Sequence, residues 1–288
     1  MMLCALSTLG LAAPAPEAPY EVGQFWEYSH EGPRPGAVEP RAIDGRRILR
    51  VIETVGAGTE KRWVIEERFT NDPKSVYRLH VRADGMLAAI VIEDEKGKSM
   101  ALTYDKPIPY QRVDMKVGDS VQIETALVMQ PGGYKLPCTI TTTRLANETL
   151  DAPAGRFADC RVYRSVTDSV FDIKVAKINT KDHRQWWYSD RARATVKEVY
   201  SKDPVKFLTF SQGKYSSTST LATFGVRAVA ETERAAVVRD VKTLAVASPV
   251  RVETHGRWKW IGALAVCTAS AAIGLRLFRK ARAPRPQM

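Results

Sequence analysis

Short extended segments dominate the pattern of hydrophobic and polar positions between Tyr20 and Leu221. Runs rich in Val, Ile, Thr and aromatic residues recur there, separated by Gly, Pro, Asp and Asn, and the 3.6-residue period of an amphipathic helix is almost absent. Turn signals such as Ala83-Asp84-Gly85 join several of these runs, so neighbouring strands are expected to be antiparallel. The pattern predicts strands at Val22–His30, Arg47–Thr54, Lys61–Phe69, Lys74–Arg82, Met86–Glu93, Ser99–Asp105, Ser120–Met129, Lys135–Glu148, Arg156–Asp168, Val170–Ile178, Arg184–Ser189, Ala194–Ser201, Val205–Ser211 and Lys214–Thr223.

The number of predicted strands determines the expected fold class. A sheet of about a dozen antiparallel strands cannot stay flat, so it has to curl, and its concave apolar face has to be closed or covered. We therefore predict a mainly β fold over residues 20–226, with one large curved antiparallel sheet (a half-barrel or open barrel). Residues 227–257 are expected to supply a short helical segment or a linker. Within them Arg227–Val246 either covers the sheet or leads toward the C-terminus, and Pro249 ends it.

The N-terminal segment is typical of an export signal. Met1–Ala13 is an apolar run, and the small residues around Ala13–Ala15 suit a cleavage site, although no Lys or Arg precedes the run. A signal peptide over residues 1–15 is the favoured interpretation, and a frayed terminal segment is the alternative.

A second apolar segment lies near the C-terminus. Trp260–Leu275 carries no charge, and the 19 residues from Trp260 to Phe278 would span about 28 Å as a helix, close to the hydrocarbon thickness of a bilayer. We predict a transmembrane helix over residues 258–278, with a buried Ala-rich core helix as the alternative. Because the residues that follow are basic, the tail at 279–288 is expected in the cytoplasm and the β domain in the periplasm, tethered to a bacterial inner membrane.

The distribution of charge argues against a nucleic-acid partner. The chain has 288 residues, a formal net charge of +11 and a pI near 9.5. From Arg251 onward the charge is +7, whereas residues 20–250 carry +5 spread over a long stretch. A dense basic stripe of the kind that duplex binding requires is therefore not expected.

Two cysteines fall in the predicted exported domain. Cys138 and Cys160 would share an oxidising compartment, where an even pair suggests one disulfide. Two buried free thiols are the alternative. The sequence has neither a C-x-x-C motif nor a Cys/His cluster, so no zinc site, redox motif or other cofactor is expected.

No local motif points to catalysis. The four His residues are scattered, and the chain contains no nucleophile elbow, Walker loop, dinucleotide fingerprint or calcium loop. We expect no catalytic or metal-binding residue. A hydrolase built from distant carboxylates remains a third, weaker hypothesis, because β proteins can assemble such pairs from separate strands.

Large aromatic residues are the most distinctive candidates for a binding site. Trp26 and Tyr28 share one strand face, and Trp186-Trp187-Tyr188 places rings on both faces of another strand. Core packing explains such residues in most proteins. The alternative is that these residues line an apolar cavity enclosed by the curled sheet, which would suit an acyl chain or another hydrophobic ligand.

Four stretches carry a resemblance to a known group of proteins. They are Val22-Gly23-Gln24-Phe25-Trp26-Glu27-Tyr28, Met115-Lys116-Val117-Gly118-Asp119-Ser120, Leu150-Asp151-Ala152-Pro153-Ala154-Gly155-Arg156-Phe157-Ala158-Asp159-Cys160, and Trp186-Trp187-Tyr188-Ser189 followed by Thr195-Val196-Lys197. In this order they resemble motifs of bacterial envelope proteins of unknown function related to the lipoprotein-carrier (LolA/LolB-like) half-barrel. In the last motif Arg191, Ala192 and Arg193 replace the group's usual glycines.

The resemblance implies a curved antiparallel sheet around a helix or cavity, in the bacterial envelope, without an assigned catalytic residue. The motifs also have physical roles: Gly23 and Gly118 let the chain turn into a strand, Pro153-Ala154-Gly155 suits a tight hairpin, and Phe157 is expected to enter the core.

Two functional hypotheses follow for a non-enzymatic, membrane-anchored envelope domain. The first is that the concavity of the sheet binds a hydrophobic or amphiphilic ligand such as a lipid or an acylated lipoprotein. Its candidate lining residues are Trp26, Tyr28, Phe157, Trp186, Trp187 and Tyr188. The second is a scaffolding module that binds another envelope protein through its sheet face or edge.

Overall fold

The computed structural model describes residues 20–33, 35, 45–70, 72–94, 96–173, 176–207, 210–232 and 234. Apart from the 3₁₀ turn η1 (Gly58–Glu60), their regular structure is almost entirely β, so the prediction of a mainly β fold is confirmed. The strands are β1 (Gln24–Glu31), β2 (Gly45–Val55), β3 (Arg62–Phe69), β4 (Asp72–Arg82), β5 (Met86–Asp94), β6 (Ser99–Pro109), β7 (Ser120–Gln130), β8 (Tyr134–Arg144), β9 (Glu148–Ala152), β10 (Gly155–Ile173), β11 (Ala176–Ser189), β12 (Ala194–Lys202), β13 (Val205–Phe207), β14 (Phe210–Gln212) and β15 (Tyr215–Val226).

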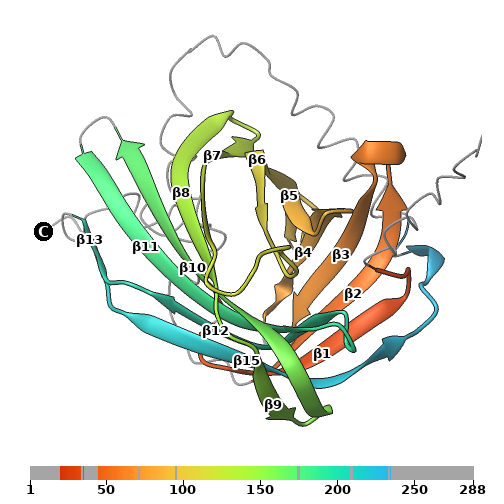
Figure 1. Ribbon diagram of the computed structural model, residues 1–288. Coiled ribbons are helices and arrows are strands. Elements are labelled where there is room, and N and C mark those ends of the chain that lie inside the picture. Colours follow the sequence, from red (N-terminus) through yellow and green to blue (C-terminus); the bar gives the residue numbers. More distant parts are fainter. Residues whose placement is uncertain are drawn as a thin grey trace, which may run out of the picture.

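Twelve of these strands close into an antiparallel barrel (Figure 1). The ring runs from β1 through β8, continues with β10, β11, β12 and β15, and returns to β1. The predicted half-barrel or open barrel is therefore wrong on this point, because each strand of the ring pairs with one strand on either side. The 19-residue strand β10 accounts for the closure, since it pairs with β8 on one side and with β11 on the other.

Irregularities in strand pairing help the sheet to curl. Register shifts occur where β1 meets β15 and β11 meets β12, and at each successive pairing from β2 to β6. An extra residue in one strand increases the local twist and bends that strand. Outside the ring, β9 pairs with the first residues of β10, and β13 and β14 form a separate hairpin.

The chain between residues 155 and 189 differs from the predicted pattern. The sequence predicts a strand break between Asp168 and Val170, but β10 continues through Ser169. Ser169 is buried and is paired with Cys138 of β8 and Thr180 of β11. A neighbour on each side holds this polar residue in the sheet, so a small polar side chain does not end the strand here.

The glycines of the sequence motifs adopt the expected turn conformations. Gly23 has a φ of 91°, and a Cβ atom there would lie 2.3 Å from the Arg227 carbonyl oxygen, so no other residue fits. Gly155 has a φ of 117° and follows a two-residue turn between β9 and β10. Where the related motif has glycines, Arg193 itself adopts a φ of 50°. The turn therefore forms without them.

The main hydrophobic core lies largely inside the ring. Trp26 and Tyr28 of β1, Leu49 of β2 and Ile65 of β3 are each at most 1% exposed and belong to this core. Phe157 also joins this core, as its motif predicts.

The predicted terminal segments lie largely outside the described residues. The signal peptide at 1–15, the transmembrane helix at 258–278 and the basic tail at 279–288 all fall there. Within the described part of the chain, no helix has the length and apolar character to cross a bilayer. Of the predicted segment 227–257, the structure describes 227–232 and 234, where a helical turn begins at Glu231 and the Arg234 amide donates to the Ala230 carbonyl.

Candidate functional site

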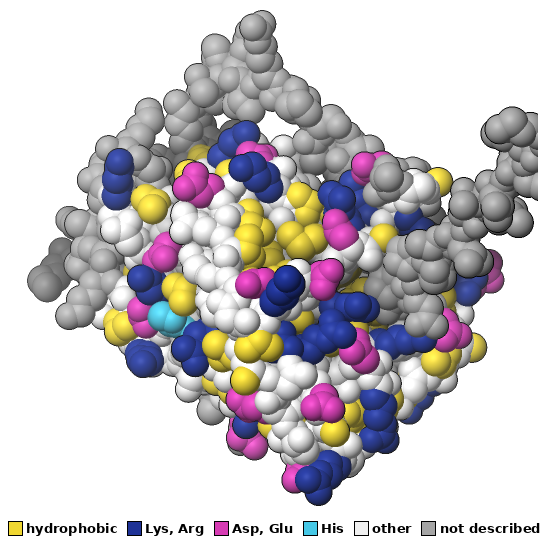
Figure 2. Space-filling model, in the orientation of Figure 1, with side chains coloured by type: hydrophobic (Ala, Val, Ile, Leu, Met, Phe, Trp, Pro, Cys, Tyr) yellow, Lys and Arg dark blue, Asp and Glu magenta, His cyan; other side chains and the backbone are white. Residues whose placement is uncertain are grey.

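The barrel contains a cavity of about 200 Å³ with two chemically different walls. A water molecule takes up about 30 Å³ in the liquid, so the cavity has room for roughly seven waters or a small ligand. In the orientation of Figure 1, hydrophobic side chains gather in the middle of the molecular face, bordered by charged side chains (Figure 2). Strands β4 to β8 form the apolar wall, with Leu79, Leu87, Ile90, Ile108, Leu127, Leu136 and Ile140. Strands β10 to β12 form the polar wall, with Ser165, Thr167, Ser169, Asp182, Arg184, Glu198 and Tyr200.

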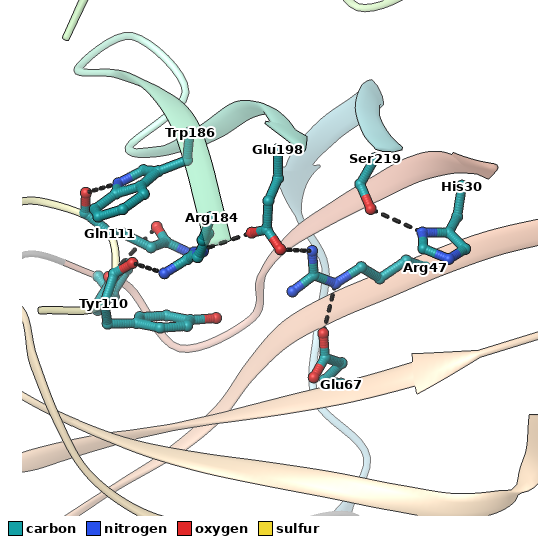
Figure 3. Close-up of polar contacts among 10 residues, drawn as sticks. His30, Arg47, Glu67, Tyr110, Gln111, Arg184, Trp186, Glu198 and Ser219 are labelled. Atoms are coloured by element: carbon teal, nitrogen blue, oxygen red, sulfur yellow. Dashed lines mark hydrogen bonds and ion pairs between the residues drawn. The ribbon is translucent and has the colours of Figure 1, made fainter. Parts of the chain in front are cut away.

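A buried ionic network lies along the polar side of the cavity (Figure 3). Glu198 is central, because its Oε1 atom is 3.4 Å from Arg47 Nη1 and its Oε2 atom accepts a hydrogen bond of 2.9 Å from Arg184 Nη2. Arg47 Nε also donates to Glu67 Oε1 at 2.5 Å. These side chains come from β2, β3, β11 and β12, so the network ties distant parts of the ring together.

Aromatic rings and backbone carbonyls hold the two arginines in place. The Arg184 guanidinium carbon is 4.5 Å from the centre of the Trp186 ring, and Arg184 Nη1 donates to the Tyr110 carbonyl oxygen at 2.8 Å. The Arg47 guanidinium carbon is 5.7 Å from the centre of the Tyr28 ring. Stacking and multiple hydrogen bonds suit the planar guanidinium group, which is less strongly hydrated than an ammonium group.

The network keeps Glu198 ionised. Burial alone would raise the pKa of the Glu198 carboxyl, but Arg184 and Arg47 outweigh it and lower that pKa from 4.5 to about 2. Burial would likewise lower the pKa of Arg47, whereas Glu198 and Glu67 raise it above the ordinary value. Both ions of this pair therefore remain charged at neutral pH.

A second polar cluster continues the same wall. Tyr200 donates to Asp182 Oδ1 at 2.9 Å, and the Lys202 ammonium lies 3.6 Å from that oxygen. Burial, followed by the nearby Asp182, raises the pKa of Tyr200, so its phenol stays protonated.

A buried Ser/His pair lies close to the network but does not line the cavity. His30 Nδ1 and Ser219 Oγ are 2.9 Å apart, and each residue is 2% exposed (Figure 3). Burial and then Arg47 are the main causes that lower the pKa of His30. A neighbouring cation of this kind opposes formation of the imidazolium that a general base must become.

The predicted aromatic residues are buried, yet none of them is among the described residues that line the cavity. Trp26, Tyr28, Phe157 and Trp187 belong to the main core, whereas Trp186 and Tyr188 form a smaller cluster with Tyr163. The lining prediction is therefore wrong for these six residues. Tyr28 and Trp186 nevertheless contribute indirectly, because their rings support Arg47 and Arg184.

The predicted tryptophans stay away from the cavity because their indole groups are engaged elsewhere. Trp26 Nε1 donates to the Ala192 carbonyl oxygen at 2.8 Å, and Trp187 Nε1 donates to Glu148 Oε2 at 2.7 Å. A buried Trp needs such a partner for its N–H group, and here that requirement directs the rings into packed regions.

The predicted disulfide is not formed, and Cys138 and Cys160 are buried free thiols. Cys138 lies opposite Ser169 of β10, whereas Cys160 is nine residues earlier on that same strand. At about 3.3 Å per residue, the two cysteines are roughly 30 Å apart, far beyond the reach of a disulfide. Burial, then Asp159 and Glu148, raises the pKa of the Cys160 thiol to about 11.

Sequence reasoning missed the ionic residues of the cavity. A signal was present: Arg47 is in phase with the apolar residues Leu49 and Val51 of its strand, and Glu198 is in phase with Val196. A charged residue on the apolar face of a strand indicates a buried charge that requires a partner. The strand pattern alone could not identify the partner, because Arg47 and Glu198 are 151 positions apart in the chain.

No family model matches the chain, and no curated protein matches it.

Among the described residues, no group of three or more His, Cys, Asp and Glu side chains is placed to hold a metal ion.

Three solved structures were found by similarity of fold. One is provisionally described as an exported protein with a YmcC-like fold from Bacteroides fragilis (11% identity, TM-score 0.36, covering 72% of this chain and 97% of that one). Another is provisionally described as a lipoprotein from Parabacteroides distasonis (10%, 0.37, 71% and 96%), and a third is the hypothetical lipoprotein YmcC from Escherichia coli (10%, 0.35, 72% and 89%). None of these descriptions names a lipoprotein carrier.

Proposed function

We propose that this chain is a non-enzymatic protein of the bacterial envelope that binds a hydrophobic or amphiphilic ligand inside its barrel. The observation that carries the proposal is the cavity itself, with Leu and Ile side chains on one wall and hydroxyl and charged side chains on the other. Ligand sites in proteins typically combine a mostly apolar lining with a few polar groups that fix the ligand's orientation. A lipid or the acyl part of a lipoprotein has this two-part chemistry.

The ionic residues support a binding role more than a catalytic one. Glycoside hydrolysis by paired carboxylates needs one of them protonated, yet the pKa of Glu198 is about 2 and both its oxygens are engaged by arginines. The His30–Ser219 pair does not line the cavity, and His30 has Arg47 beside it rather than a carboxylate partner on the described residues.

The closed ring weakens the alternative of a scaffold that pairs through a sheet edge. In a closed barrel the backbone groups of each strand pair with neighbours on both sides. Among the described strands of the main sheet, β9 is the one that ends the order with a single neighbour, and it is five residues long. Within the ring, β6 and β7 pair over Ala101–Tyr104 and Leu127–Gln130 alone, so a docking partner would have short edges available rather than a long open strand.

The export signal and the C-terminal span complete the proposal. They would place the barrel in the periplasm, anchored to the inner membrane by residues 258–278, with residues 279–288 in the cytoplasm. A reporter fused after Met288 is expected to be active only in the cytoplasm, and activity in the periplasm would refute this orientation.

Ligand binding can be tested by filling the cavity. The full chain, held in solution by an amphipathic polymer, would be titrated with the uncharged probe N-phenyl-1-naphthylamine, whose fluorescence rises in an apolar site. Ile90 lines the cavity, so Ile90→Trp is expected to abolish most of the saturable signal, whereas Val170→Trp, at an exposed position on β10, should retain it. Absence of saturable binding by the unmodified chain would refute the proposed function.

A further inference from the structure

The charges around the cavity are already balanced by one another. Three cations, Arg47, Arg184 and Lys202, face three anions, Glu67, Glu198 and Asp182, and each takes part in at least one ion pair within this set. A ligand with a charged head group would bring a net charge into this closed set. It would have to break an existing pair to find a counterion, because buried charges need partners.

The uncommitted polar groups at the cavity are hydroxyls. Tyr110 lines the cavity and is 6% exposed, and its phenol oxygen has no hydrogen-bond partner among the described residues. The phenol extends from the Tyr110 backbone toward the Arg47 end of the network (Figure 3). The phenol oxygen is itself buried, so the Tyr110 ring has to turn toward the cavity before a ligand can reach it. A buried hydroxyl without a partner costs free energy, which the ligand then recovers by forming the missing hydrogen bond.

A row of small hydroxyl side chains continues this surface. Ser165, Thr167 and Ser169 occupy alternate positions of β10, so they lie on the same face of the strand, and all three line the cavity. Hydroxyl groups both donate and accept hydrogen bonds, so they match the hydroxyl and ester groups of an uncharged polar ligand.

We propose that the cavity selects an amphiphile whose head group is uncharged and carries hydroxyl groups, of the monoacylglycerol class, over anionic or cationic amphiphiles of the same chain length. This inference rests on the proposed function, and it specifies the class of ligand. The apolar wall takes the acyl chain, and the head group meets the Tyr110 phenol and the β10 hydroxyls.

A competition experiment with three matched ligands tests the inference. Monolauroylglycerol, laurate and dodecylammonium share a twelve-carbon chain and differ in charge. Each would displace N-phenyl-1-naphthylamine from the full chain at neutral pH and below its critical micelle concentration. We expect monolauroylglycerol to compete at the lowest concentration. Equal or tighter binding of laurate or dodecylammonium would overturn the inference while leaving the proposed function in place, whereas failure of the probe itself to bind would refute the proposed function.

A pair of Tyr→Phe variants isolates the hydroxyl contribution. Tyr110→Phe removes one oxygen at the cavity and is expected to weaken binding of monolauroylglycerol about fivefold, with the probe's own affinity unchanged. Tyr188→Phe is the matched control, because Tyr188 is equally buried but is not among the residues that line the cavity. Unchanged competition by Tyr110→Phe, or an equal loss in Tyr188→Phe, would contradict the proposed role of the Tyr110 phenol.

Discussion

Removing the charge of Glu198 is expected to destabilise the barrel strongly. Glu198→Gln keeps the size of the side chain but leaves Arg184 without its carboxylate partner and Arg47 with Glu67 alone. Breaking a buried ion pair by removal of one partner typically costs about 3–5 kcal/mol. The low pKa of Glu198 gives a similar figure, because the difference between 4.5 and about 2 corresponds to about 3 kcal/mol at neutral pH.

The same linkage predicts how this effect depends on pH. The pKa of Glu198 is lower in the folded chain than in the unfolded chain, so its contribution to stability is complete above about pH 4.5. The contribution is lost as the pH falls from there toward about 2. The difference in stability between the unmodified chain and Glu198→Gln should therefore shrink over this range and be constant at higher pH.

Urea denaturation followed by tryptophan fluorescence measures this difference, because Trp26 and Trp186 are fully buried. The expected loss at neutral pH is about 3 kcal/mol in the free energy of unfolding. In thermal denaturation the same loss would lower the melting temperature of a domain of this size by roughly 6–12 °C. Glu124→Gln is the matched control, since Glu124 lies exposed on β7. If Glu198→Gln were no less stable than Glu124→Gln, or if its deficit did not diminish below pH 4.5, the assignment of Glu198 as the centre of the network would be wrong.

Three further predictions concern other buried groups. Burial is the main cause that lowers the pKa of His80 from 6.5 to about 3, so the free energy of unfolding should fall as the pH decreases from 6.5 toward 3. His80→Leu should remove about 2 kcal/mol of that loss between pH 7 and 5. An unchanged dependence of the free energy of unfolding on pH, measured by urea denaturation, would contradict this. Trp186→Phe removes the 2.7 Å hydrogen bond to the Gln111 carbonyl and should cost about 1–2 kcal/mol by the same assay, so a neutral substitution would count against that bond. Cys138 and Cys160 should be alkylated in the urea-unfolded chain equally with and without reductant, and a mass deficit without reductant would indicate a disulfide.

The strands were largely predictable from the sequence, whereas closure of the barrel was not. Period-two alternation and turn residues depend on neighbours in the chain, which is why β1 and the hairpin at Gly155 follow the motifs closely. Closure depends on β10 pairing with β8 over Tyr163–Ser169 and with β11 over Arg161–Ile173, a property of the whole sheet. Residue patterns give no direct measure of how many strands complete a ring.

The candidate site was harder to predict for a related reason. The sequence draws attention to Trp26 and Trp186 because indole rings are large and conspicuous, yet these two rings pack tightly in hydrophobic clusters and do not line the cavity. The cavity is lined by ordinary Leu and Ile residues, by aromatic residues that the sequence does not single out, such as Tyr77 and Tyr104, and by charged residues whose partners are remote in the chain. Tertiary pairing therefore decides the site, and local spacing carries little information about it.

The number of strands itself explains why a cavity exists. An eight-stranded barrel is just wide enough for side chains to fill its interior, and the diameter grows roughly linearly with the number of strands. A ring of twelve strands therefore has more interior than Val, Ile and Leu can occupy. Tryptophans and tyrosines such as Trp26 and Tyr28 fill part of it, and the long arginines Arg47 and Arg184 bridge another part through their carboxylate partners. Where the lining consists of short residues such as Ser165 and Thr167, the interior stays open. The ionic network thus has a structural role, because it supports the wall of a space that the strand number creates. A ligand of the proposed kind would meet a wall whose charges are already paired.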